Sequence, residues 1–418
     1  MYLLAAAKGS CHAERGEASN VPPIKASRNH PFPRVVNTGP IIGSMRVEQV
    51  ELFHIRIPLV APFETSFGVT AERETILARV VADGVAGWGE SIADAAPGYA
   101  YETVTTNWHI LSDYLIPALF RAPVDDPREL PARFEHVRGH PMAKATLEAA
   151  MWNIAAQQAG LSLRDYIGRL TGRPMKDRVA VGVSIGIQPT TEKLLERIAS
   201  FLEYGYLRIK IKIKPGRDLQ DARAARRAFP DCLLMVDANS AYTLRDADLF
   251  KQMDDLNLLM IEQPLGYDDI YEHSRLQPQI KTPICLDESI HSPGHAQLAI
   301  ALGACKIINI KQGRVGGLTQ AIAVHDICEA HGVPVWCGGM LETGVGRALN
   351  LALAALPNFT LPSDLSASNR YYNPDLIDPP FTINSDGTLS VPTGLGLGVN
   401  VVPERLRRVT LRHQVFRP

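Results

Sequence analysis

The chain has 418 residues with 43 basic and 44 acidic side chains, and 46% of its residues are hydrophobic. This balance gives no excess of positive charge that would attract nucleic acid or a membrane surface. The length allows two domains, or one large barrel with an appended segment. The six cysteines include no CxxC pair, which favours buried thiols in a reducing compartment over disulfides or zinc ligands. No apolar run approaches the roughly 20 residues that span a bilayer, so we expect a cytoplasmic protein.

Residues 1–44 differ in composition from the rest of the chain. A short apolar run, Leu3–Ala7, precedes Lys8, which is the reverse of the order in a secretory signal, and a stretch rich in Ser, Asn, Pro and His follows. We expect a disordered extension with no part in the fold, and Met45 is a possible alternative start.

Residues 45–175 are predicted to form an α+β domain. The loop Pro62–Gly68 carries two phenylalanines and a glycine between the first two strands. On this pattern it is a surface hairpin, with a lid over a site as the alternative. The predicted strands, turn and helices are Val47–Pro58, Thr75–Ala82, Gly87–Glu90 (a turn), Tyr101–Leu119 and Pro141–Ala159.

Residues 176–372 show apolar strands alternating with helices, which predicts an α/β fold of the TIM-type (β/α) barrel class. The strands are Val179–Ile187, Leu207–Ile213, Leu233–Asn239, Leu259–Leu265, Ile284–Ser289, Ile307–Gln312, Val333–Gly339 and Phe359–Leu365. The clearest helices are Asp221–Ala228, Pro293–Leu302, Leu318–Ala330 and Glu342–Leu356.

Residues 373–418 break this alternation with Pro-rich coil and short strands. The glycines of Pro392–Val399 neither follow a strand nor open a helix, so they are not a dinucleotide-binding fingerprint. We expect this segment to return to the first domain.

Charged residues recur at the ends of the predicted barrel strands. Lys212, Asp237, Glu262, Asp287 and Lys311 follow one another at intervals of 25, 25, 25 and 24 residues. Carboxyl ends of barrel strands carry the chemistry of barrel enzymes, and three carboxylates meeting there repel one another unless a cation lies between them. All-oxygen ligation suits Mg²⁺, whereas ion pairs with helix residues are the structural alternative. No His/Cys set at zinc spacing competes.

The strand that ends in Lys212 places Lys210, Lys212 and Lys214 on one face. Lys212 and Lys311 flank the carboxylates, and a lysine acts as a general base only when its pKa is lowered, which a metal and the like charge of Lys210 would favour. Lys210 could also bind a substrate carboxylate, while Lys214 is better explained as a surface charge.

Three further residues lie beside the candidate site. Arg314 could tune Lys311 or cap a loop, and both interpretations stay open. Asn239 and Glu288 are neighbours of the metal ligands, with support or packing as plausible as ligation.

A metal-bound substrate carboxylate would acidify its α-proton, and an enediolate would form when a lysine removes it. Reprotonation on the opposite face by the second lysine would give racemisation. Departure of a β-leaving group would give dehydration instead.

The Lys210-Ile-Lys212, Asp237, Glu262, Asp287 and Lys311 set resembles the muconate-lactonising-enzyme subgroup of the enolase superfamily. Four longer runs resemble more specifically the o-succinylbenzoate synthase / N-acylamino acid (N-succinylamino acid) racemase family: Pro283–Ile290, Ile307–Gly317, Val335–Arg347 and Leu356–Pro362. The resemblance covers Arg46–Val399. It implies an α+β capping domain whose loops, Phe63–Gly68 among them, close over the barrel.

The resemblance also implies a substrate pocket, beside which Asn239 and Arg314, by their positions in the sequence, are candidates for supporting roles. The implied pocket residues are Ser184, Ser289, Gly339 and Met340, with Tyr371 a weaker candidate. The chain departs from the family pattern at Gln312, Ser363 and Asn153, none of which is a predicted metal ligand.

The implied function is that of an o-succinylbenzoate synthase, a lyase that dehydrates 2-succinyl-6-hydroxy-2,4-cyclohexadiene-1-carboxylate in menaquinone biosynthesis, with Lys212 as base and Lys311 as a cation facing the ring. The alternative is an N-succinylamino acid racemase that uses both lysines, and one site could support both activities. Gly338–Glu342 disfavours a dipeptide epimerase or cycloisomerase. A barrel without turnover is disfavoured because every lysine and ligand is present. We expect a small carboxylate substrate and a homo-oligomer.

Overall fold

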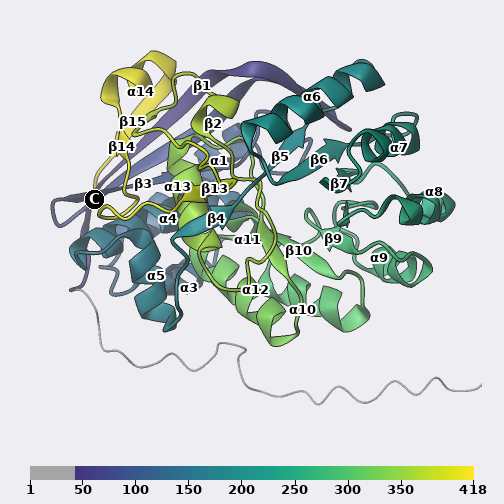
Figure 1. Cartoon of the computed structure of the whole chain (residues 1–418). Coiled ribbons are helices and arrows are strands. Elements are labelled where there is room, and N and C mark those ends of the chain that lie inside the picture. Colours follow the sequence, from purple (N-terminus) through teal and green to yellow (C-terminus); the bar gives the residue numbers. More distant parts are fainter. Residues whose placement is uncertain (1–42) are drawn as a thin grey trace, which may run out of the picture. The chain divides into compact units, whose positions relative to one another are not determined.

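The computed structural model describes residues 43–418 (Figure 1). The expectation of a disordered extension therefore falls on residues that lie, except for Gly43 and Ser44, outside the described part. Met45 pairs with Val124 through reciprocal backbone hydrogen bonds of 2.8 and 2.9 Å. No helix in residues 43–418 is both long enough and apolar enough to cross a bilayer.

A four-stranded antiparallel sheet has the order β15-β1-β2-β3. Its strands are β1 (Val47–Thr65), β2 (Gly68–Ala82), β3 (Val85–Glu90) and β15 (Thr410–Phe416). Figure 1 shows the C-terminal strand β15 beside β1, with which it pairs antiparallel. The last strand of the chain thus completes the first sheet.

The segment Pro62–Gly68 is the end of a hairpin, as the sequence-based interpretation expected, since β1 and β2 continue to a two-residue turn at Ser66 and Phe67. One expectation for this sheet is corrected. Gly87–Glu90 is a strand and not a turn. Its glycines are needed for close packing, since a Cβ at Gly87 or Gly89 would collide with the backbone of the helix Pro141–Gln158.

Helices cover one side of the antiparallel sheet. The predicted helix Tyr101–Leu119 is divided by a π-helical turn, and the predicted helix Pro141–Ala159 is a single helix, buried along most of its length. The elements are α1 (Val104–Ile110), η1 (Leu111–Leu115), α2 (Ile116–Phe120), η2 (Pro127–Glu129), α3 (Leu130–Arg133), α4 (Pro141–Gln158) and α5 (Leu163–Thr171).

A seven-stranded parallel sheet has the order β11-β10-β9-β8-β7-β6-β5, so each strand pairs with its neighbour in sequence. Its strands are β5 (Gly182–Ile185), β6 (Arg208–Lys212), β7 (Leu233–Asp237), β8 (Ile261–Glu262), β9 (Ile284–Leu286), β10 (Ile307–Ile310) and β11 (Val335–Cys337). The first predicted strand is split, because β4 (Arg178–Ala180) pairs instead with β13 (Thr388–Ser390). These strands confirm the predicted α/β fold class.

The eighth predicted strand, Phe359–Leu365, is not a strand in the structure. It makes one isolated parallel bridge to β11, at Phe359, and another at Ser363 to Val181 beside β5. Two backbone hydrogen bonds of 2.8 Å, from Gly182 N to Ser363 O and from Asp364 N to Cys337 O, connect it to both edges of the parallel sheet. Isolated bridges of this kind are too sparse to form a regular ladder.

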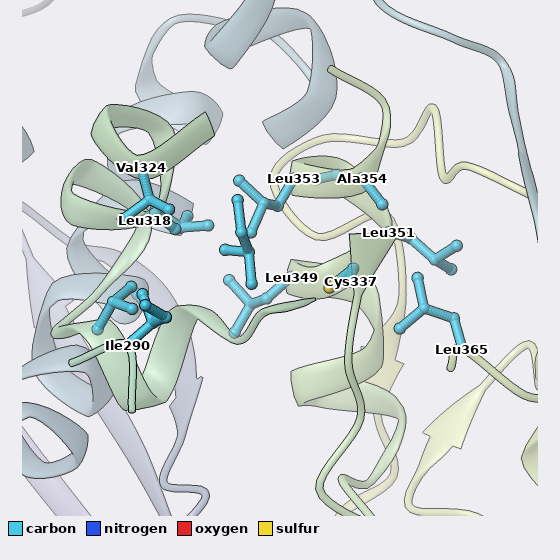
Figure 2. Close-up of a cluster of buried hydrophobic side chains, with 14 of the residues drawn as sticks. Ile290, Leu318, Val324, Cys337, Leu349, Leu351, Leu353, Ala354 and Leu365 are labelled. Atoms are coloured by element: carbon cyan, nitrogen blue, oxygen red, sulfur yellow. The ribbon is translucent and has the colours of Figure 1, made fainter. Parts of the chain in front are cut away.

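Helices connect the parallel strands in the order expected for repeated βα units. Figure 2 shows side chains of two of them, α12 and α13, gathered in the buried core, among them Leu318, Val324, Leu349 and Leu353. The helices are α6 (Thr191–Tyr204), α7 (Leu219–Ala228), α8 (Ala247–Met253), α9 (Tyr271–Leu276), α10 (Pro293–Leu302), α11 (Gln312–Val315), α12 (Leu318–Ala330) and α13 (Gly344–Ala354). The remaining elements include η6 (Ser368–Arg370), β12 (Ile377–Asp378), β14 (Asn400–Val401) and α14 (Pro403–Val409).

Candidate active site

Strand register brings the predicted carboxylates together. Lys212 is opposite Asp237, Asp237 is opposite Glu262, and Glu262 is opposite Cys285. Asp287 lies two residues beyond Cys285, on the same side of its strand by alternation. The exposed fractions of Asp237, Glu262 and Asp287 are 1%, 0% and 1%. Three acidic side chains that were 25 residues apart in sequence therefore share one buried end of the sheet.

The predicted lysines contact these carboxylates from both sides. Lys212 Nζ donates to Asp237 Oδ2 at 2.6 Å and to Asn239 Oδ1 at 2.7 Å. Lys311 Nζ donates to Asp287 Oδ2 at 2.7 Å. Lys210 Nζ donates to Glu262 Oε2 at 2.8 Å and lies 3.2 Å from Asp237 Oδ2. Lysines and carboxylates thus form one buried network.

Burial and mutual repulsion perturb the carboxyl groups. Burial, together with the neighbouring Asp237 carboxylate, raises the pKa of Glu262 to about 8. Burial alone would also raise the pKa of Asp237, but Lys212 and Lys210 outweigh it and hold that pKa below its usual range. Burial and the repulsion among the three carboxylates therefore favour the protonated form of Glu262.

The pKa of Lys311 differs from the sequence-based expectation. Burial alone would lower it, but the Asp287 carboxylate outweighs burial and raises the pKa of the ammonium group above its ordinary value. The expectation of a lowered lysine pKa assumed a cation nearby, whereas here the lysine itself is the counter-ion of the carboxylate.

The residues present fit a divalent cation. Asp237, Glu262 and Asp287 offer only carboxylate oxygens, the ligands preferred by hard cations such as Mg²⁺, and the raised pKa of Glu262 reports negative charge that a cation would relieve. A second acidic cluster, His325, Asp326 and Glu329, lies on α12. Arg173 forms ion pairs with both of its carboxylates, so that cluster is an ion-pair network.

A pocket opens beside the lysines and contains most of the predicted substrate residues. Ser184, Gly339, Met340 and Tyr371 line it, and so does Asn239. Lys210, Lys212 and Lys311 all reach it, together with Phe63, Thr65, Phe67, Thr70, Asp94, Tyr99, Leu341 and Asp364.

Ser289 does not line this pocket, contrary to the implied role. Its hydroxyl donates to Asp269 O at 2.6 Å and accepts from Gln263 Nε2 at 2.6 Å. Gln263 Oε1 in turn accepts from the backbone N–H of Asp287 at 3.0 Å. Ser289 is therefore part of the scaffold that holds the loop of Asp287.

The structure gives hydrogen-bond or ion-pair partners to three residues whose roles the sequence left open. Arg314 forms an ion pair with Asp287 and donates to Ile290 O at 2.8 Å and to Asn309 O at 2.6 Å, so it holds the carboxylate against two strand ends. Glu288 is buried, and its Oε1 accepts from Asn239 Nδ2 at 3.0 Å. Lys214 is 39% exposed and pairs with Glu64 at 2.9 Å. Arg314 thus has a supporting position next to the carboxylate that Lys311 binds.

Sequence reasoning missed Tyr99. Its hydroxyl donates to Asp287 Oδ1 at 3.1 Å and accepts from Lys311 Nζ at 3.1 Å, and the same ammonium group lies 4.3 Å from the ring centroid. Tyr99 comes from the irregular segment between β3 and α1, which carries no motif. No signal in a single sequence would have placed it here.

Asp364 was also missed, although a signal existed. It ends the eighth predicted strand as an acidic residue, just as Asp237 ends β7. Its carboxylate lies 2.6 Å from both Arg208 Nη2 and Lys210 Nζ. Asp364 falls outside the 25-residue series because β11 lies between Lys311 and Asp364 and ends in Cys337, which carries no charge.

The tip of the β1–β2 hairpin lies against the pocket. Ser66 Oγ donates to Asn239 O at 3.1 Å, and Glu64 O accepts from Ile187 N at 2.9 Å. Phe63 and Phe67 contribute to the pocket wall. The hairpin connects the antiparallel sheet to the strand ends that carry the lysines.

Comparisons with known proteins identify the family of this chain. Residues 48–168 match the N-terminal domain model of the mandelate racemase / muconate lactonizing enzyme family, and residues 193–405 match the enolase C-terminal domain-like model. The chain belongs to the mandelate racemase / muconate lactonizing enzyme family of the enolase superfamily.

Individual relatives narrow the resemblance. An o-succinylbenzoate synthase from Geobacillus kaustophilus is 50% identical over 374 residues, 89% of this chain and 98% of the relative. An N-succinylamino acid racemase from an Amycolatopsis species is 48% identical over 367 residues, 88% of this chain and 98% of the relative. A solved enolase-superfamily structure from Listeria innocua superimposes with a TM-score of 0.85 at 40% identity, covering 89% of this chain and 99% of that chain.

Proposed function

We propose that this chain is a Mg²⁺-dependent o-succinylbenzoate synthase that dehydrates 2-succinyl-6-hydroxy-2,4-cyclohexadiene-1-carboxylate. One observation carries the proposal: Lys212 and Lys311 line the same pocket. Lys212 forms an ion pair with Asp237 and Lys311 forms one with Asp287, so the two lysines lie on either side of the buried carboxylates. The two kinds of relative, synthases and racemases, support a reaction that starts by removing a proton next to a carboxylate.

Asp237, Glu262 and Asp287 would hold the cation. When bound, Mg²⁺ would withdraw charge from the substrate carboxylate and so make the neighbouring C–H more acidic. Lys210 and Arg314 keep the carboxylates in place through their own contacts. The hairpin tip, with Phe63 and Phe67, would keep water from the pocket when substrate is bound.

Lys212 is the proposed base. Its Nζ would take the proton from the carbon that bears the carboxylate, and the same proton would leave with the ring hydroxyl as water, which balances the dehydration. Asp237 and Asn239 orient the amine through its two hydrogen bonds. Lys311 would remain a cation, held by Asp287 and Tyr99, and would stabilise negative charge on the ring.

Racemisation of N-succinylamino acids is the second candidate. It is favoured by one observation, that Lys311 lines the same pocket as Lys212 and reaches it from a different strand. One lysine could remove the α-proton and the other return a proton to the opposite face. Both reactions share the first step, so one pocket could carry out both.

The closed barrel and the division into two domains belong to the same proposal. The segment Phe359–Leu365 would close the seven-stranded sheet into a (β/α) barrel, which its hydrogen bonds to both edge strands support. Residues 45–175 and 373–418 would form the capping domain and residues 176–372 the barrel, which the β15–β1 pairing supports.

The purified enzyme should be assayed with Mg²⁺ on both substrates in parallel. Loss of the cyclohexadiene absorbance measures dehydration, and optical rotation of N-succinyl-L-phenylalanine measures racemisation. Dehydration that disappears in the Lys212→Ala variant would support the synthase. Absence of both reactions in the folded wild-type enzyme would contradict the proposed function.

A further inference from the structure

Arg370, the last residue of η6, lies directly behind one wall of the pocket. Its guanidinium carbon is 4.7 Å from the ring centroid of Tyr371 and 5.9 Å from that of Phe63, and both rings line the pocket. Its Nη2 donates to the backbone carbonyl of Ser184 at 3.0 Å, and Ser184 also lines the pocket. One cation therefore touches three parts of the same wall.

This cation differs from the others around the pocket in having no carboxylate partner. Lys210, Lys212, Lys311 and Arg314 each form an ion pair with a carboxylate of the candidate metal site, and Lys214 pairs with Glu64. Among residues 43–418, Arg370 forms no ion pair with a carboxylate, and its Nε finds no hydrogen-bond acceptor. The positive charge behind this wall is thus not neutralised by the protein.

A second polar group near Arg370 also lacks a hydrogen-bond partner among the described residues. The Ser184 hydroxyl is buried, lines the pocket and finds no hydrogen-bond partner among the described residues. A donor that is buried without an acceptor is costly, and such groups often await a ligand. Ser184 and Arg370 are joined through the Ser184 carbonyl, so both unsatisfied groups belong to one corner of the pocket.

The substrates of both candidate reactions share a chemical feature that fits this corner. Succinylbenzoate and succinylamino acid precursors carry, besides the carboxylate at the reacting carbon, a second carboxylate at the end of the succinyl chain. The lysines at the metal end are already paired with carboxylates. The second carboxylate therefore needs a separate source of positive charge.

We propose that Arg370, together with the Ser184 hydroxyl, forms a subsite for the distal carboxylate of a succinyl-bearing substrate. Arg370 acts as a positioning residue: it supplies the charge and holds the Tyr371 ring by cation–π contact while Ser184 donates the hydrogen bond. The inference rests on the proposed function, because it assumes a substrate with a succinyl chain.

Binding of two product analogues tests the subsite apart from turnover. o-Succinylbenzoate and 2-butyrylbenzoate have chains of the same length, but only the first ends in a carboxylate. Titration calorimetry with the Mg²⁺-loaded enzyme should show at least about tenfold tighter binding of o-succinylbenzoate to the wild type, as expected for a charge-assisted hydrogen bond. In Arg370→Met this ratio should fall severalfold, to what the Ser184 hydroxyl alone supports, and in Arg370→Lys most of the ratio should remain.

Arg197 provides a matched control. It lies on α6 with its guanidinium carbon 5.0 Å from the Phe201 ring, which Arg370 also contacts at 4.9 Å, but it does not line or back the pocket wall. Arg197→Met should leave the ratio unchanged. Melting temperatures of all variants show whether they are folded.

The outcomes separate the two claims. If the wild type binds both analogues equally, or if Arg370→Met weakens both equally, the distal-carboxylate subsite is wrong and Arg370 has only a structural role. If the folded wild type binds neither analogue and turns over neither candidate substrate, the proposed function itself fails.

Discussion

At the residue scale, Asp364 is a carboxylate that forms ion pairs with two buried cations. Arg208 and Lys210 are 0% and 4% exposed in their side chains, and each lies 2.6 Å from one Asp364 oxygen. The Trp336 ring lies beside both cations, 5.2 Å from Arg208 and 4.9 Å from Lys210. Asp364 thus shares the neutralisation of Lys210 with Glu262 and Asp237, and it also neutralises Arg208.

Asp364→Asn should destabilise the protein by about 3–5 kcal/mol, because the change removes the carboxylate partner of the buried Arg208 and one of the three carboxylates around Lys210. Burial alone would raise the pKa of Asp364, but Arg208 and Lys210 outweigh it and hold the pKa well below its usual range. A lowered pKa contributes stability above the unfolded value of about 4 and loses it as the pH falls. In urea unfolding, the difference in the free energy of unfolding between wild type and variant should therefore become smaller at acidic pH.

An exposed pair serves as the control for this prediction. Asp386 pairs with Arg178 at 2.8 Å, with side chains 48% and 58% exposed. Asp386→Asn should change stability little, because exposed pairs are weak. Equal stability of Asp364→Asn and the wild type at neutral pH would refute the role given to Asp364.

The residues of the site were partly predictable from the sequence. Asp237, Glu262, Asp287, Lys212 and Lys311 were found because strand ends repeat at a nearly constant interval. Tyr99 was not, since its position depends on how one sheet packs against another. Ser289 was misplaced because its hydroxyl is used by Gln263 and Asp269, a tertiary contact that no local pattern encodes.

At the element scale, buried glutamates fix the beginnings of three helices. Glu90 accepts from Thr343 N at 2.9 Å and Gly346 N at 2.8 Å, at the start of α13. Glu148 of α4 accepts from Leu318 N at 2.7 Å and Thr319 N at 2.9 Å, at the start of α12. Free N–H groups and the helix dipole both favour a carboxylate there.

Glu102 completes the set at the start of α4, where it accepts from Met142 N at 2.9 Å and Ala143 N at 3.1 Å. Glu90 and Glu148 belong to elements packed with the antiparallel sheet, whereas α12 and α13 follow strands of the parallel sheet. These two carboxylates therefore connect the two sheets of the fold.

Glu148 should make stability depend on pH. Burial raises the pKa of Glu148 to about 7 despite its hydrogen bonds. A raised pKa contributes stability that is fully present below the unfolded value of about 4.3 and is lost as the pH rises through 7. From pH 5 to pH 8 the wild type should lose up to about 3 kcal/mol relative to Glu148→Gln, measured by urea unfolding.

The control is Glu196→Gln, which removes an exposed surface carboxylate that pairs with Lys193. The free energy of unfolding of this variant should change with pH in the same way as that of the wild type. A difference between wild type and Glu148→Gln that stays constant from pH 5 to pH 8 would contradict the assignment.

Element prediction succeeded where one local pattern dominates. The predicted helices Pro293–Leu302 and Leu318–Ala330 have the observed bounds. The turn predicted at Gly87–Glu90 was wrong because its glycines serve close packing against α4. Phe359–Leu365 was predicted as a strand from its apolar residues, but it makes too few backbone contacts for a regular ladder.

At the scale of the whole molecule, the three carboxylates should couple metal binding to stability. A ligand that binds only the folded state stabilises it by about 2.7 kcal/mol at a hundredfold excess over Kd. Mg²⁺ should therefore raise the melting temperature by several degrees relative to EDTA. Asp237→Asn should lose most of this shift, and a shift as large as that of the wild type would place the cation elsewhere.

The central claim is that Lys212 removes the proton next to the substrate carboxylate while Lys311 remains a cation. The most direct measurement is the rate of dehydration with Mg²⁺ by the wild type, Lys212→Ala, Lys311→Ala and Lys311→Arg. Lys212→Ala should lose at least about a hundredfold in rate, and Lys311→Arg, which keeps the positive charge, should dehydrate the substrate faster than Lys311→Ala. A folded Lys212→Ala variant that dehydrates the substrate as fast as the wild type would contradict the account.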